Sequence, residues 1–134
     1  MDKAKELDIT VKKSWIINDN SRNTSSGYNS MNRMLDGVSY PEGLYVMYDT
    51  VVAGVLQSMK EHGLKSPDDI ELVSYGDNVV LHYLSPTITT IRVPTSQLVG
   101  SMLTLLIDVL EGKEEPEIIK EEPSIVYRES SPAP

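Results

Sequence analysis

Hydrophobic residues along the chain occur in two patterns, short continuous runs and repeats of three or four positions. Residues 43–48 (GLYVMY) form an almost continuous apolar run, which predicts a strand covered on both faces, and residues 70–73 (IELV) predict another strand. Between and before these runs, apolar residues recur every three or four positions, which predicts helices over 25–35 and 49–62. Short strands that alternate with helices indicate an α/β fold built on a mostly parallel sheet.

The remaining segments predict further elements of the same kind. We expect a short polar helix over 2–7, brief strands over 14–17 and 87–91, a late strand over 123–128 and a tail from 130 to 134, whereas 79–84 is ambiguous. Residues 1–113 would form one α/β unit, and residues 114–134 would supply an acidic loop, the late strand and the tail.

The helix predicted over 95–111 has an unusual distribution of apolar residues. Leucine, isoleucine, valine and methionine lie almost all the way round it, from Leu98 to Leu110. A helix with one buried face carries a single apolar stripe, so this helix is expected to be buried on more than one side.

Charge and composition narrow the possible functions. The 134 residues carry a formal net charge of −8, from 20 acidic against 12 basic residues, so we expect this segment to repel the phosphate backbone of nucleic acids. Without cysteine, the chain has no disulfides, no thiolate zinc site and no cysteine nucleophile. His62 and His82 are its only imidazoles, so we expect no metal and no cofactor.

The sequence contains none of the motifs that would indicate an enzyme. There is no Gly-x-Ser-x-Gly turn, no phosphate-binding glycine loop and no histidine base near a nucleophile, so the chain is predicted not to be an enzyme. The glutamates of 111–122 read as a solvated loop, because nothing holds two carboxylates at a fixed separation there. No signal-peptide or membrane-spanning stretch is present, and we expect a cytoplasmic location without membrane contact.

Three stretches, in this order and spacing, resemble one family. They are YVMYDTVVAGVLQSMKEHGLKSPDDIELVSYGDN (45–78), SPTITTIRVPTSQLVGSMLTLLIDVLEGK (85–113) and PSIVYRESSPAP (123–134). Together they are similar to the C-terminal half of LacI/GalR-type bacterial transcription regulators. The resemblance implies a three-layer, periplasmic-binding-protein-like (type I) C-terminal subdomain, incomplete in this chain, with its ligand cleft at the carboxyl ends of the strands.

The resemblance also implies what this chain lacks. The family's helix-turn-helix and first α/β subdomain are absent, so DNA would be bound only through a domain outside this chain. The helix over 95–111 would pack on the missing subdomain, and the strand at Trp15–Ile17 would lose its neighbour. We therefore expect this chain alone to be unstable, to exchange elements with a second copy, or to be held by a partner.

Four residues are candidates for ligand binding by this resemblance. Asp49 ends a strand and starts a helix, where its carboxylate could accept ligand hydroxyls or simply cap the helix. Tyr48 could stack on a sugar or fill the cleft. Gly76 stands where the family commonly has a ligand-binding Asp; Asp77 could substitute, or the turn could merely need glycine. Arg22 suits an anionic ligand if it is not simply solvated.

The family's dimer contact corresponds to a different part of the sequence. His82, Tyr83 and Leu84, with Val52 on the helix over 50–61, are the interface candidates. The resulting interpretation is an effector-sensing and dimerisation portion of a transcription regulator, with a sugar or sugar phosphate as the effector class. The alternative is a fragment of an exported sugar-binding transport receptor of the same fold.

Overall fold

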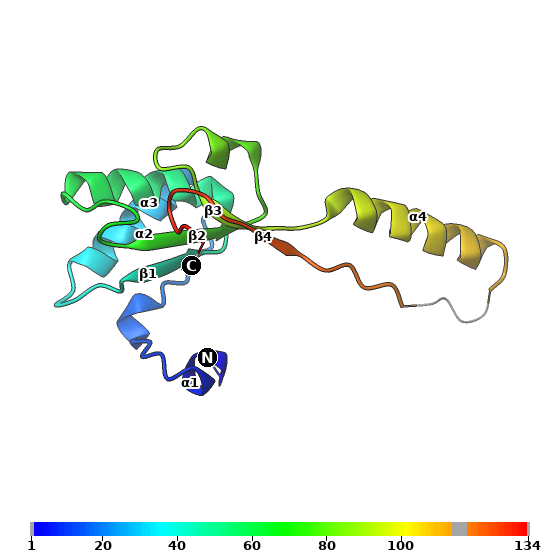
Figure 1. Cartoon of the computed structure of the whole chain (residues 1–134), viewed down its shortest axis with the longest axis horizontal. Helices are drawn as coiled ribbons and strands as arrows, with labels where there is room; N and C mark the ends of the chain where they lie inside the picture. Colours follow the sequence, from blue (N-terminus) through cyan, green and yellow to red (C-terminus); the bar gives the residue numbers. More distant parts are fainter. Residues whose placement is uncertain (1, 114–117, 134) are drawn as a thin grey trace.

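The computed structural model describes residues 2–113 and 118–133 (Figure 1). The predicted sequence of elements is largely confirmed, with short 3₁₀ turns at Lys13–Trp15 and Val79–His82. The helices and strands are α1 (Asp2–Glu6), α2 (Thr24–Leu35), β1 (Gly43–Val46), α3 (Asp49–Glu61), β2 (Glu71–Tyr75), β3 (Thr89–Arg92), α4 (Thr95–Leu110) and β4 (Ser124–Val126). Residues 114–117 of the predicted acidic loop lie outside the described residues.

The four strands form one mostly parallel sheet in the order β1-β2-β3-β4. β1 and β2 pair in parallel, as do β2 and β3, whereas β4 returns antiparallel to β3 with Arg92 opposite Ser124. Helix α3 connects the parallel neighbours β1 and β2, as a βαβ crossover requires. The parallel arrangement brings the carboxyl ends of β1, β2 and β3 to a single edge.

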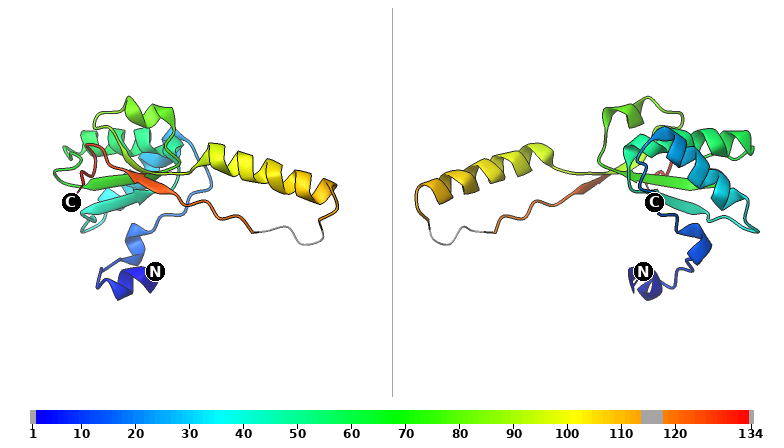
Figure 2. Two further views of the ribbon diagram at one scale, coloured as in Figure 1. Left: turned by 45° about the vertical axis from the view of Figure 1, so that its right-hand side comes forward. Right: turned by 180° about the vertical axis from the view of Figure 1, so that it is seen from behind.

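Helices α2 and α3 cover one face of the sheet and enclose the core (Figures 1 and 2). The fully or almost fully buried apolar side chains lie between these helices and the strands: Met31, Met34, Val46, Val52, Val55, Met59, Ile70, Leu72, Leu81 and Ile88. Asn23 caps α2 by accepting a hydrogen bond from the Ser26 amide, in a capping box with the Ser26 side chain. This capping box fixes the residue at which α2 begins.

The opposite face of the sheet remains open in the described residues. Tyr45 is 54% exposed and Tyr75 is 41% exposed, and Ile125 on β4 is 55% exposed. Strand 43–48, predicted to be covered on both faces, is therefore covered on one. The described chain has two of the three layers that the resemblance implies.

Residues 14–17 do not form the predicted strand. Lys13–Trp15 is a 3₁₀ turn, and Ile16 follows in extended conformation without a strand partner. A strand needs a neighbour for its backbone hydrogen bonds, and within residues 2–113 and 118–133 β1 pairs with β2 alone. Trp15 is held instead by its side chain, whose Nε1 donates to Ser39 O at 2.9 Å.

Helix α4 extends away from the sheet, joined to it by the ends of β3 and β4 (Figures 1 and 2). None of its residues is buried. Seven of its large apolar side chains are between 51% and 77% exposed: Val99, Met102, Leu103, Leu106, Ile107, Val109 and Leu110. The helix that the sequence predicts to be buried on more than one side is therefore not covered by any other part of the described residues.

The segment after β4 is not the loose tail that the sequence indicates. Ser130 is fully buried, and its Oγ donates to Leu72 O at 2.6 Å and accepts from the Thr89 amide at 2.9 Å. Its carbonyl also accepts from the Leu72 amide. Ser130 therefore links β2 to the start of β3, next to the first paired residues, Val73 and Thr89. This role needs a small hydroxyl side chain, and it leaves no periodic pattern in the sequence.

Substituting Ser130 by alanine tests this link. The Leu72 carbonyl loses one donor and the Thr89 amide loses its acceptor in a site closed to water. We expect Ser130→Ala to lower the free energy of unfolding by about 2–4 kcal/mol. Ser131→Ala is the matched control, because Ser131 Oγ contacts only the exposed Glu71 carboxylate, and it should change stability by under about 0.5 kcal/mol. Urea denaturation measures both, and equal effects would contradict the assigned link.

Candidate functional site

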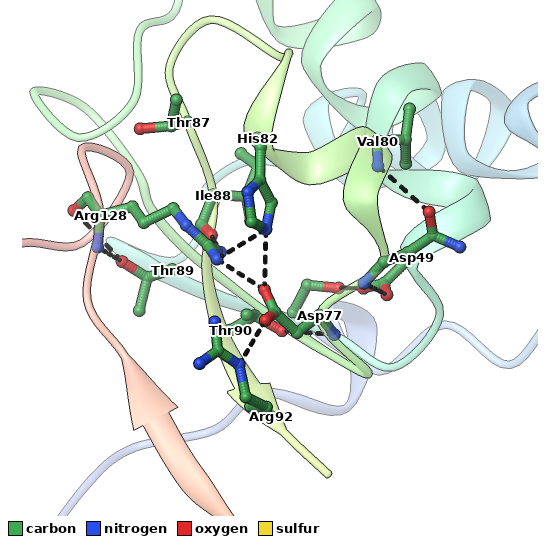
Figure 3. Close-up of polar contacts among 12 residues, drawn as sticks. Asp49, Asp77, Val80, His82, Thr87, Ile88, Thr89, Thr90, Arg92 and Arg128 are labelled. Atoms are coloured by element: carbon green, nitrogen blue, oxygen red, sulfur yellow. Dashed lines mark hydrogen bonds and ion pairs between the residues drawn. The ribbon is translucent and has the colours of Figure 1, made fainter. Parts of the chain in front are cut away.

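The carboxyl ends of β1, β2 and β3 bring most of the candidate residues to one edge of the sheet. Tyr48 and Asp49 follow β1, Gly76 and Asp77 follow β2, and Arg92 ends β3. Parallel α/β sheets bind ligands at this edge. Figure 3 shows the polar contacts that surround Asp49 and Asp77.

Arg22 and Tyr48 lie together although 25 residues separate them along the chain. The Arg22 guanidinium carbon is 4.4 Å from the centroid of the Tyr48 ring. The Thr50 hydroxyl donates to Arg22 O at 2.8 Å, so the start of α3 holds the loop that carries this arginine. A guanidinium stacked on an aromatic face keeps its N–H donors directed outward in its plane. The pair therefore offers hydrogen-bond donors beside a flat apolar ring.

Asp49 ties β1 to β2 rather than capping α3. It is the first helical residue, and the N-cap position belongs to Tyr48. Ser74 Oγ lies 2.6 Å from Asp49 Oδ1, and the Asn78 amide donates to Oδ2 at 2.8 Å. A carboxylate oxygen can accept two hydrogen bonds, and each oxygen of Asp49 accepts one here, so Asp49 retains acceptor capacity while it fixes the turn after β2.

Gly76 is required at its position for two reasons. Its φ of +118° lies in the region that favours glycine, and a Cβ there would approach Asp49 Oδ2 to 2.8 Å. Gly76 thus makes room for the Asp49 carboxylate beside the turn.

Asp77 faces away from Asp49, toward β3 and the segment after β4 (Figure 3). Its side chain is only 8% exposed, and its carboxylate accepts from Arg92 Nε and from Arg128 Nη2, each at 2.6 Å. His82 Nε2 lies 3.3 Å from Asp77 Oδ1 and 2.9 Å from Arg128 Nη2. That nitrogen either accepts from Arg128 or donates to Asp77, since it has one hydrogen-bonding position.

The two arginines control the charge of this aspartate. Burial alone would raise the pKa of Asp77, but the hydrogen bonds from Arg128 and Arg92 outweigh it and lower the pKa below its ordinary value. A lowered carboxyl pKa in the folded state stabilises the fold above the unfolded pKa and ceases to do so as the pH falls through the folded one. Asp77 is therefore ionised at neutral pH, and its carboxylate is bound by Arg92 and Arg128.

An open hollow of about 540 Å³ lies beside these residues, at the base of α4. Gly76, Asp77 and Arg92 line it from the sheet, Thr95 and Ser96 line it from the first turn of α4, and Ser124 lines it from β4. It occupies the place where the chain leaves the sheet and returns to it. Tyr48 and Arg22 do not line it.

The predicted interface residues separate into different environments. Tyr83 is 83% exposed, and it follows the exposed Val79 and Val80 on the 3₁₀ turn. Leu84 packs partly against the core, and His82 is engaged with Asp77 and Arg128. Val52 is fully buried between α3 and the sheet, so its assignment to a dimer surface is wrong. The helical spacing places Val52 on an apolar face, but that face is the one turned to the core.

Sequence reasoning did not identify Arg92, Arg128 and Ser74 as partners in this site. Arg128 lies 51 residues from Asp77 and meets it only because β4 returns beside β3. An isolated arginine has no characteristic spacing from its partner in the sequence. A buried serine near the end of a strand likewise cannot be distinguished from other strand residues. The described residues contain no cluster of three metal-ligating side chains, and no helix among them is long and apolar enough to span a bilayer.

Comparison with known proteins agrees with the geometry. Residues 2–131 match the family model described as a periplasmic binding protein-like domain. The HTH-type transcriptional repressor PurR of Yersinia pestis bv. Antiqua is 30% identical over 126 residues, covering 93% of this chain and 37% of the repressor. The chain thus spans well under half the length of the curated relatives it matches.

Solved structures show the same fold. A LacI-type transcription regulator from Bifidobacterium animalis subsp. lactis aligns with a TM-score of 0.86 at 21% identity, over 99% of this chain and 48% of that chain. The transcriptional regulator CelR in complex with cellobiose aligns with a TM-score of 0.85 at 21% identity, over 97% and 40%. The chain is similar over almost its whole length to part of longer transcription regulators, and it belongs to the periplasmic binding protein-like domain family.

Proposed function

We propose that this chain forms one wall of an effector cleft in a LacI/GalR-type transcription regulator. The observation that carries the proposal is the convergence of Tyr48, Asp49 and the turn at Gly76 at the carboxyl ends of parallel strands, with Arg22 stacked on Tyr48. The curated relatives named as transcriptional repressors support the regulatory role. They also favour a regulator over an exported receptor or an enzyme.

The proposed effector is a small sugar or sugar phosphate. The Tyr48 ring would contact a sugar ring by its edge or by the face that Arg22 does not cover. The Asp49 carboxylate would accept hydrogen bonds from hydroxyl groups, and the Arg22 guanidinium suits a phosphate or other anion. A cellobiose complex among the similar regulators is consistent with a carbohydrate. No negatively charged side chain contacts the Arg22 guanidinium among the ion pairs found in the described residues.

The second wall of the cleft and the DNA contact would come from polypeptide outside this chain. The relatives are longer, and the exposed apolar side chains of α4 supply a surface for a second α/β subdomain. We propose that effector binding closes the two subdomains and shifts the population of a dimer between two DNA-binding states, in the cytoplasm. Tyr83, with the neighbouring Val79 and Val80, is the proposed dimer contact.

Arg22→Ala tests the ligand site in the complete gene product. Cellobiose, glucose 6-phosphate and inorganic phosphate are added in turn, and the shift in melting temperature is recorded. We expect at least one sugar compound to stabilise the protein, and Arg22→Ala to weaken its binding roughly tenfold, equivalent to about 1.4 kcal/mol. Arg33→Ala, which removes an exposed arginine paired with Asp19, is the matched control and should leave binding unchanged. Equal binding by Arg22→Ala and the unaltered protein would contradict the proposed site.

A further inference from the structure

Helix α4 is connected to the sheet by β3 and β4, and Asp77, in the turn after β2, contacts β3 and the segment that follows β4. β3 leads out to α4 and β4 leads back, and the two pair with each other through Arg92 and Ser124 (Figure 1). Arg92 ends β3, and only Val93 and Pro94 separate it from the first residue of α4. Proline restricts φ in that short connection, so the position of Arg92 largely determines where the helix starts.

One carboxylate binds both β3 and the segment after β4. Asp77 Oδ2 accepts from Arg92 Nε and Oδ1 accepts from Arg128 Nη2, each at 2.6 Å. The side chain of Arg128 is 12% exposed and that of Asp77 is 8% exposed, so water screens this pair little. Arg128 also donates from Nη1 to Ile88 O at 2.5 Å and from its amide to Thr89 Oγ1 at 2.7 Å. The segment after β4 is thereby fixed against β3.

The other side of the same turn belongs to the proposed cleft. Gly76 leaves the space that Asp49 occupies, and the Asn78 amide donates to Asp49 Oδ2. Asp77 lies between these two residues with a φ of +59°, a left-handed conformation that directs its side chain to the opposite side. A single turn of three residues therefore contacts the Asp49 carboxylate on one side, and β3 and the segment after β4 on the other.

We propose that Asp77 is the positioning residue that couples the turn at the cleft edge to α4, so that the turn and the base of the helix move as one rigid body. The inference rests on the proposed function in one respect, the assignment of that turn to the cleft. A ligand that moves the turn would then change the direction of α4 through the two arginines. Without the carboxylate, the two strands would act as a loose hinge.

The distance between α3 and α4 tests the coupling without any ligand. The chain has no cysteine, so spin labels can be attached at Lys60→Cys and Thr104→Cys, two exposed positions on the two helices. Pulsed electron–electron double resonance on labelled chain diluted into unlabelled chain gives the intramolecular distance distribution. We expect Asp77→Asn to broaden that distribution roughly twofold. Asparagine keeps the size and tolerates the left-handed conformation, but it removes the charge.

Two further variants separate coupling from general destabilisation. Arg92→Gln removes one ion pair at a half-exposed side chain and should broaden the distribution by a smaller factor than Asp77→Asn. Glu129→Gln neutralises a neighbouring carboxylate that contacts only Thr87 and should leave the width unchanged. Unchanged widths in both Asp77→Asn and Arg92→Gln would overturn the proposal, as would equal broadening by Glu129→Gln. Failure of the effector-binding experiment would leave this result untouched, so the two proposals fail separately.

Discussion

Replacing Gly54 by alanine will lower the free energy of unfolding by about 3 kcal/mol, because α2 and α3 touch backbone to backbone at this residue. A Cβ on Gly54 would lie 1.9 Å from Thr24 O and 2.7 Å from Tyr28 N. The facing Gly27 is equally confined, since its Cβ would lie 2.1 Å from Val51 O. Backbone atoms cannot move aside as a flexible side chain could, so the two helices must separate.

Gly100 provides the matched control for this prediction. It also lies inside a helix, but a Cβ there meets no atom within 4 Å. The same substitution should therefore stabilise the chain by up to about 1 kcal/mol, because alanine favours the helix more than glycine does. Thermal or urea unfolding of the two variants gives opposite signs if the close approach is real. A Gly54→Ala variant as stable as the unaltered chain would contradict the packing of α2 on α3.

The second large effect concerns the exposed helix. The 134-residue chain alone should self-associate through α4 at micromolar concentration, because its large apolar side chains are otherwise left in water. Leu103, Leu106 and Leu110 share one side of the helix at spacings of three and four residues. Substituting all three by glutamate should weaken association about 100-fold or more, since burying one leucine contributes about 1.5–3 kcal/mol.

Sedimentation velocity measures this association directly. The unaltered chain should sediment above its monomer mass of 14.9 kDa, and the triple variant should sediment at that mass. Thr104→Glu is the control, because it adds a glutamate to the same helix at an exposed polar position and removes no leucine. A monomeric, cooperatively unfolding sample of the unaltered chain would show that the exposed face of α4 needs no partner.

The sequence predicts the periodic features of this fold and misses those that depend on a neighbour. The spacing of apolar residues predicts α2 and α3, because burial on one side imposes a period, and short runs of apolar or β-branched residues predict β2 and β3. The segment at 14–17 has the composition of a strand but no adjacent strand to bind, and it forms a 3₁₀ turn instead. Ser130 reads as part of a polar tail, yet the return of β4 places it inside the sheet.

The same distinction applies to the candidate site. Tyr48, Asp49 and Arg22 could be selected from positions relative to predicted elements and from the family resemblance, and the fold brings them to one edge. The orientation of Asp77 could not, because it depends on a left-handed φ and on Arg128, which lies far along the chain. Val52 shows why an apolar helix face does not identify an interface: the same residue types occupy a buried core face and an interface face, and Val52 lies on the core face.

The most direct test of the central claim is the reading frame of the gene upstream of the Met1 codon. If this chain is the C-terminal part of a LacI/GalR-type regulator's effector-binding region, the frame continues without a stop codon through a first α/β subdomain and a helix-turn-helix. An export leader ahead of the same subdomain would assign the chain to a transport receptor instead. A stop codon and ribosome-binding site directly before Met1 would contradict the account, because the second wall of the cleft would have no source in the gene.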